Sequence, residues 1–229
     1  MSRPGALLSW STGKDSAFTL AVLRERAEVD VVGLVSTVNA GADRVAMHGV
    51  RRELLLRQAE AVGLPVHEVN IPWPCSNEEY ETAMAAVVAA AHAQGVSRMA
   101  FGDLFLADIR AYREEKLRGT GLEPMFPLWG RDTTALAREM VDAGVKAMIS
   151  CVDTAQLDPA FAGRSFDPEL LRDLPSTVDP CGENGEFHTF TWDGPGFGWP
   201  VPVQVGQSVD RDGFMFTDLL LDAGGREPG

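Results

Sequence analysis

A short polar turn carries the residues best suited to phosphate chemistry. It reads Ser11-Thr12-Gly13-Lys14-Asp15-Ser16, between an apolar run from Gly5 to Ser9 and a helical pattern from Ser16 to Arg26. Backbone N–H groups at the start of a helix bind phosphate. Hydroxyls can donate to phosphate oxygens, Lys14 can neutralise phosphate charge, and Asp15 can hold Mg²⁺, which prefers oxygen ligands. The turn predicts a nucleotide site, with a simple helix N-cap as the alternative.

Two familiar glycine loops do not fit this turn. A Walker A loop needs glycine where Leu8 stands, and serine or threonine where Asp15 follows Lys14. The dinucleotide pattern G-x-G-x-x-G is also absent from the sequence. A different class of phosphate loop is therefore expected.

A second polar loop lies in the last third of the chain, just ahead of an expected strand. Residues Cys181 to Thr189 contain two glycines, Glu183, Asn184, Glu186 and His188. Such a loop either reverses the chain or presents its polar groups to a ligand. A carboxylate pair can bind a cation and accept protons from an attacking ammonium. His188 can move a proton or serve as a hydrogen-bonded structural residue.

Composition narrows the class of protein. The 229 residues are 45% hydrophobic and 23% charged, which is typical of a globular chain. The net charge of −13 makes nucleic acid an unlikely partner. Three scattered cysteines and four scattered histidines offer no metal-site spacing. The longest apolar run, Met84 to Ala91, is too short to span a membrane, and no secretory signal precedes the first strand, so we expect a cytoplasmic protein.

Hydrophobic periodicity predicts alternating strands and helices up to about residue 126. Strands are expected at 5–9, 29–38, 66–71, 98–101 and 123–125, with helices at 16–26, 50–62, 77–94 and 106–118. This order implies right-handed crossovers and a parallel sheet. Beyond it we expect a helix at 133–143 and strands at 145–152, 187–192, 201–209 and 214–221. The predicted domains are 1–126 and 127–222, followed by a flexible tail at 223–229.

The first turn resembles the Ser-Gly-Gly-x-Asp-Ser pyrophosphate loop of the N-type ATP pyrophosphatases, in the adenine-nucleotide α-hydrolase superfamily. Thr12 replaces the first glycine, which reduces the freedom to adopt a positive φ. Further motifs resemble the diphthine–ammonia ligase-like branch, over Gly5 to about Phe197. They are His48-Gly49 with Glu53-Leu54-Leu55 and Gln58-Ala59, Gly102-Asp103, Pro127-Leu128-Trp129-Gly130 with Asp132, and Cys181 to Thr189.

The resemblance implies an α/β fold: a five-stranded parallel Rossmann-like (HUP-type) sheet with a second, smaller α+β domain. It implies ATP contacts at Ser9, Ser11, Thr12, Gly13, Lys14, Asp15, Ser16, Thr37, Val38, His48, Gly102 and Asp103. It also implies that the acidic loop faces the nucleotide. Substrate contacts are then expected at Arg110, Glu183, Asn184, Glu186 and His188, catalytic roles at Lys14, Asp15, Glu183 and Glu186, and Mg²⁺ at Asp15.

The activity implied is an ATP pyrophosphatase and amide ligase that adenylates a carboxylate, releases pyrophosphate, and passes the acyl group to ammonia or an amine. The acid is unidentified; it is diphthine on elongation factor 2 if the host makes it. Homo-oligomerisation is left open.

Two rival functions are compatible with a pyrophosphate-type loop. A tRNA-modifying pyrophosphate-loop enzyme would need sulfur chemistry and an RNA surface, which three isolated cysteines and the negative charge disfavour. An ATP-binding regulator of the universal-stress type would lack the second domain and its carboxylate loop.

Overall fold

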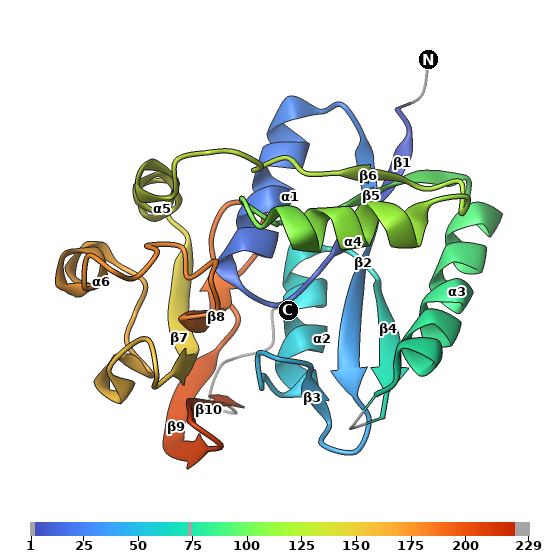
Figure 1. Ribbon diagram of the computed structural model, residues 1–229. Helices are drawn as coiled ribbons and strands as arrows, with labels where there is room; N and C mark the ends of the chain where they lie inside the picture. The colour runs from blue at the N-terminus through green and yellow to red at the C-terminus, as the bar shows by residue number, and fades with distance from the viewer. Residues whose placement is uncertain (1–2, 73–74, 223–229) are drawn as a thin grey trace.

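The first sheet carries five parallel strands. The computed structural model describes residues 3–72 and 75–222 (Figure 1); the predicted tail at 223–229 lies outside them. The parallel strands occur in the order β4-β2-β1-β5-β6. Their bounds are Val66–Ile71, Asp30–Asn39, Gly5–Ser9, Val96–Ala100 and Glu123–Met125, respectively. A short β3 (Arg44–Val45), which was not predicted, runs antiparallel to the end of β2. The five-stranded parallel sheet is confirmed.

Helices cover both faces of this sheet. The pleat of β1 turns Ala6 and Leu8 towards one core, which includes α1 (Lys14–Arg26) and α2 (Arg52–Val62). Leu7 faces the other core, which receives α3 (Asn77–Ala93) and α4 (Ala107–Leu117). Since α1 begins two residues before the predicted start, Lys14 and Asp15 belong to its first turn. The sheet is therefore doubly wound, with the polar turn at its carboxyl edge.

The second sheet is antiparallel, in the order β8-β7-β10-β9. Its strands are β7 (Lys146–Asp153), β8 (Phe187–Asp193), β9 (Val203–Arg211) and β10 (Phe214–Leu221). The helix α5 (Thr133–Asp142) packs in the same core as α6 (Pro168–Asp173). Neither α6 nor the 3₁₀ turn at Pro159–Phe161 was predicted. With six and three residues, both are too short to show a helical period, although capping aspartates precede them.

The two sheets share hydrophobic packing. The core around Leu8, Trp10 and Leu54 also contains Phe190 and Leu219 from the second sheet. The proposed division at residue 127 remains a prediction. Within 3–72 and 75–222, no helix is both long and apolar enough to cross a bilayer.

Candidate active site

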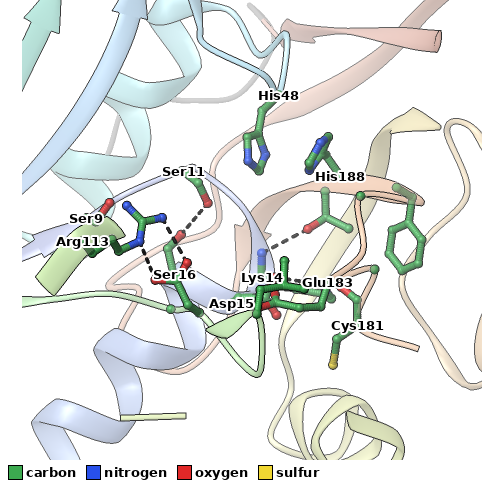
Figure 2. Close-up of a pocket in the computed structure, with 17 residues that line it drawn as sticks. Ser9, Ser11, Lys14, Asp15, Ser16, His48, Arg113, Cys181, Glu183 and His188 are labelled. Carbon is green, nitrogen blue, oxygen red and sulfur yellow. Dashed lines mark hydrogen bonds and ion pairs between the residues drawn. The ribbon is translucent and has the colours of Figure 1, made fainter. Parts of the chain in front are cut away.

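A cavity of about 220 Å³ lies above the start of α1, where the two halves of the chain meet (Figure 2). The first half contributes Ser9, Ser11, Lys14, Asp15, Ser16, His48, Gly102, Asp103, Leu106 and Arg113. The second half contributes Cys181, Gly182, Glu183, Gly185, Phe187, His188 and Thr189. The acidic loop therefore faces the polar turn, as the resemblance implied.

The polar turn has a left-handed residue at its centre. Thr12 has φ of 71°, the conformation that glycine adopts most easily. Its carbonyl accepts hydrogen bonds from the Gln58 side chain at 3.0 Å and from the Thr191 N–H at 2.9 Å. Thr12 is fully buried and does not line the cavity. Its role is to set the shape of the turn.

Two serine hydroxyls stabilise the turn, and the backbone after β5 lies close to the backbone of α1. Ser16 Oγ donates to the Gly13 carbonyl at 2.9 Å, and Ser11 Oγ lies 3.3 Å from Ser16 Oγ. Gly13 itself does not line the cavity. A Cβ at Gly102 would lie 3.2 Å from the Asp15 backbone, so glycine there lets the end of β5 approach α1.

Lys14 is a buried, charged group under the cavity. Its ammonium lies 2.9 Å from Asp15 Oδ2 and also contacts the Cys181 carbonyl. Burial is the largest single effect and would lower the pKa of Lys14, but Asp15, Cys181 and Glu183 together outweigh it and raise the pKa above its ordinary value. Burial raises the pKa of Asp15, against the opposing effect of Lys14. The protein thus holds a fixed positive charge where phosphate oxygens would lie.

Glu183 reaches across the cleft from the acidic loop. Its Oε1 accepts the N–H of Leu104 at 2.7 Å, and more weakly that of Phe105 at 3.4 Å. Burial is the main reason that the pKa of Glu183 rises to about 7, and the nearby Asp15 adds to it. A carboxylate with a pKa near neutral suits a proton acceptor.

Glu186 has a different role from its neighbour. It is 2% exposed, and its carboxylate accepts the N–H of Asp179 at 2.8 Å and of Asn184 at 3.0 Å. The Asn184 side chain donates to it as well, at 3.0 Å. Neither Glu186 nor Asn184 lines the cavity. The two residues close the loop that presents Glu183, so only one of the expected carboxylate pair reaches the site.

Two histidines stand side by side on the cavity wall (Figure 2). The ring centroids of His48 and His188 are 4.5 Å apart. Burial lowers the pKa of His188 to about 4 and that of His48 well below its ordinary value, and the charge of Lys14 contributes to both. Both imidazoles are therefore neutral near pH 7 and can accept a hydrogen bond.

A second cavity of about 850 Å³ adjoins the first. It extends from the carboxyl ends of β1, β2 and β5 to the space between α3 and α4. Thr37 lines it, whereas Val38 is 1% exposed and belongs to the core behind. The lining is largely apolar, as expected for a base or another flat ligand.

Arg110 does not reach either cavity. Its guanidinium carbon lies 4.8 Å from the ring centroids of both Phe126 and Trp129, and it pairs with Glu114 at 2.7 Å. Arg113, one turn further along α4, lines both cavities instead. The sequence predicted Arg110 as a substrate contact and did not predict Arg113.

Thr189 is a second functional contact that was missed. Its Oγ1 accepts the backbone N–H of Lys14 at 3.1 Å, so β8 holds the first turn of α1 in place. The residue stands at the end of the acidic loop that the sequence had singled out. No local pattern distinguishes it from the other threonines of that strand.

Magnesium fits this donor set only together with a nucleotide. Within the part of the chain that the structure describes, no group of three or more His, Cys, Asp or Glu residues could hold a metal. Asp15 Oδ1, however, is buried and has no hydrogen-bond partner among the described residues. Mg²⁺ typically binds one or two carboxylates and completes its shell with phosphate oxygens and water. Asp15 can supply the protein ligand of such a site.

Most of the chain matches known protein families and curated relatives. Residues 5–124 match the family model of the diphthamide synthase N-terminal domain, and residues 132–215 match that of the C-terminal domain. The diphthine–ammonia ligase of Danio rerio is 30% identical over 233 residues, covering 91% of this chain and 90% of that protein. The diphthine–ammonia ligase of Homo sapiens is also 30% identical, over 70% of this chain and 66% of the human protein.

A solved structure shows only a weak likeness. The U34-tRNA thiolase NcsA from Methanococcus maripaludis aligns with a TM-score of 0.40 and 16% identity, over 62% of this chain and 58% of that one.

The pyrophosphate-loop site, the α/β fold and the ligase relatives define the class of protein, an ATP-dependent amide ligase. Within that class, the chain belongs to the diphthamide synthase family.

Proposed function

We propose that the chain adenylates a carboxylate with ATP and Mg²⁺ and then transfers the acyl group to ammonia. One observation carries this proposal: Lys14 of the polar turn and Glu183 of the acidic loop line the same cavity, although they come from opposite halves of the chain. One supplies positive charge for phosphate and the other a proton acceptor. Both are needed where a phosphate leaves and an amine attacks.

In the first step, a carboxylate oxygen of the acid attacks the α-phosphorus, and the bond to the β-phosphate breaks. The turn at Ser11 to Ser16 and the Lys14 ammonium hold the departing pyrophosphate as its charge grows. Mg²⁺ bound through Asp15 would neutralise further phosphate charge. No protein side chain needs to form a covalent bond.

In the second step, ammonia attacks the acyl carbon and AMP leaves. Ammonia is mostly ammonium at neutral pH, so a proton must be removed before attack. Glu183 is the proposed acceptor because its pKa lies near 7. The neutral imidazoles of His48 and His188 line the same wall and offer nitrogen atoms to an N–H donor.

The acid is proposed from the relatives. They are named for diphthine, so diphthine on elongation factor 2 is the substrate to test first, in a host that makes it. The nitrogen donor named for them is ammonia. A cytoplasmic location stays a prediction, and homo-oligomerisation stays open.

The test uses the full chain, α-labelled ATP, Mg²⁺, ammonium and diphthine-bearing elongation factor 2. We expect AMP and pyrophosphate to form only when the acid is present, together with amidated elongation factor 2 in the mass spectrum. Asp15→Ala should lower AMP formation, and Glu183→Ala should slow amide formation by about 10²-fold. A protein that binds ATP but never forms AMP would instead be a regulator.

A further inference from the structure

The two cavities meet at a small set of side chains. Four residues line both of them: Ser9, Ser11, His48 and Arg113. The small cavity contains the polar turn and the large cavity is mostly apolar. If the pyrophosphate occupies the first and the nucleoside the second, the α-phosphate must lie between them, at these four residues. This placement rests on the proposed function.

Arg113 is the only cation among the four, and its orientation is fixed. Its Nε lies 2.7 Å from Asp103 Oδ2, and its Nη2 donates to Asp103 Oδ1 at 3.0 Å. Its guanidinium carbon lies 4.5 Å from the centroid of the Phe101 ring. Within 3–72 and 75–222, the remaining nitrogen, Nη1, has no hydrogen-bond or ion-pair partner. A guanidinium held on one edge by a carboxylate offers its free edge to an anion.

The other cation of the site, Lys14, already has its own partners in the small cavity. Lys14 Nζ is 5.4 Å from the ring centroids of both Phe166 and Phe187, and it contacts Asp15 and the Cys181 carbonyl. Lys14 lines the small cavity but not the large one. The positive charge at the place where the two cavities meet must therefore come from Arg113.

We propose that Arg113 binds the α-phosphate of the nucleotide, with Asp103 holding the guanidinium in position. Negative charge on the non-bridging α-phosphate oxygens is present in the ground state and persists as the acid attacks. A pre-oriented cation there makes the phosphorus more open to an anionic nucleophile. Arg113 would then distinguish a nucleotide from a nucleoside.

The experiment measures binding of adenosine, AMP and inorganic pyrophosphate to the full chain by calorimetry. The wild type should bind AMP more tightly than adenosine. Arg113→Ala should reduce the AMP-to-adenosine affinity ratio by about 10- to 100-fold, the range for a hydrogen bond to a charged group. Its affinity for pyrophosphate should fall less than its affinity for AMP, and unchanged binding of adenosine, which carries no phosphate, shows that the variant is folded. If the alanine variant does not fold, Arg113→Gln, which can still donate to Asp103, replaces it.

Arg110→Ala is the matched control. Arg110 is the same residue type on the same helix, but it pairs with Glu114 and lines neither cavity, so the AMP-to-adenosine ratio should not change. An unchanged ratio in Arg113→Ala, or a wild type without any preference for AMP, overturns the inference. Neither result bears on whether AMP is produced during turnover, which judges the proposed function separately.

Discussion

The backbone N–H of Leu104 donates to Glu183 Oε1 at 2.7 Å, although 79 residues separate the two along the chain. Leu104 belongs to the loop that follows β5, and Glu183 belongs to the acidic loop of the second half. This bond joins the two walls of the cavity. It also leaves Oε2 as the carboxylate oxygen without a hydrogen bond inside the described chain.

Replacing Glu183 should change the pH dependence of stability. The ordinary pKa of 4.5 rises to about 7 in the folded protein, mainly through burial. Between these values the folded state binds more protons than the unfolded state, so stability falls as pH rises from about 4.5 through 7. Thermal unfolding at pH 5 and pH 8 should show a smaller loss for Glu183→Gln than for the wild type. Parallel curves for the two proteins would contradict the raised pKa.

The same group should control the rate. Since a general base must be unprotonated, amide formation by the wild type should increase as pH rises through about 7. In Glu183→Gln the residual rate, which free ammonia carries, should lose the plateau that the wild type reaches above about 7. The measurement is kcat/KM for ammonium, the species that Glu183 deprotonates, as a function of pH.

Glu186→Gln should mainly lower the stability of the fold. Glu186 accepts three hydrogen bonds from Asp179 and Asn184, and an amide nitrogen in place of one oxygen cannot accept them all. We expect a loss of about 1–3 kcal/mol in the free energy of unfolding, measured with urea. Glu183→Gln is the control, since it should lower the rate without that loss. Equal stability of Glu186→Gln and wild type would show that the loop closes without this carboxylate.

Thr12 offers a test of backbone strain. A β-branched residue at φ of 71° is strained, and the buried Thr12 Oγ1 has no hydrogen-bond partner within 3–72 and 75–222. Thr12→Ala and Thr12→Gly both remove the hydroxyl, but only glycine removes the Cβ. The glycine variant should be more stable than the alanine variant by about 1 kcal/mol in urea unfolding. An alanine variant as stable as the glycine variant would mean that the turn relaxes to a negative φ.

Cys181→Ala should leave AMP formation intact. The thiol is buried, donates to the Thr133 carbonyl at 3.4 Å, and has a pKa raised by burial, so it is a poor nucleophile. Its backbone carbonyl contacts Lys14, and the alanine variant keeps that carbonyl. Loss of activity without loss of thermal stability would revive a sulfur-transfer mechanism.

The sequence predicted most of the fold because its signals are strong and local. The apolar strands and the glycine-ended α2 were found, and their alternation implied a parallel sheet, which is confirmed. The sequence did not show which arginine of α4, Arg110 or Arg113, faces the cavities. Only Leu117 of that helix is buried, while Ile109 and Tyr112 are exposed, so its apolar residues do not show which face meets the sheet. Glu183 and Glu186 also look equivalent in sequence. Only the folded loop shows that Glu183 lines the cavity while Glu186 is buried within the loop.

The buried side chain of Gln58 has a consequence for the whole molecule. It accepts from Trp10 Nε1 at 2.8 Å and donates to the carbonyls of Thr12 and Thr191, so a single amide fastens α2, the polar turn and β8 together. Thr189 also holds the start of α1, so residues from both halves of the chain fix the conformation of the polar turn. A fragment ending at residue 126 would keep the motif that looks diagnostic in sequence, yet lack the scaffold that gives the motif its form. We therefore expect nucleotide binding to require residues from both halves of the chain.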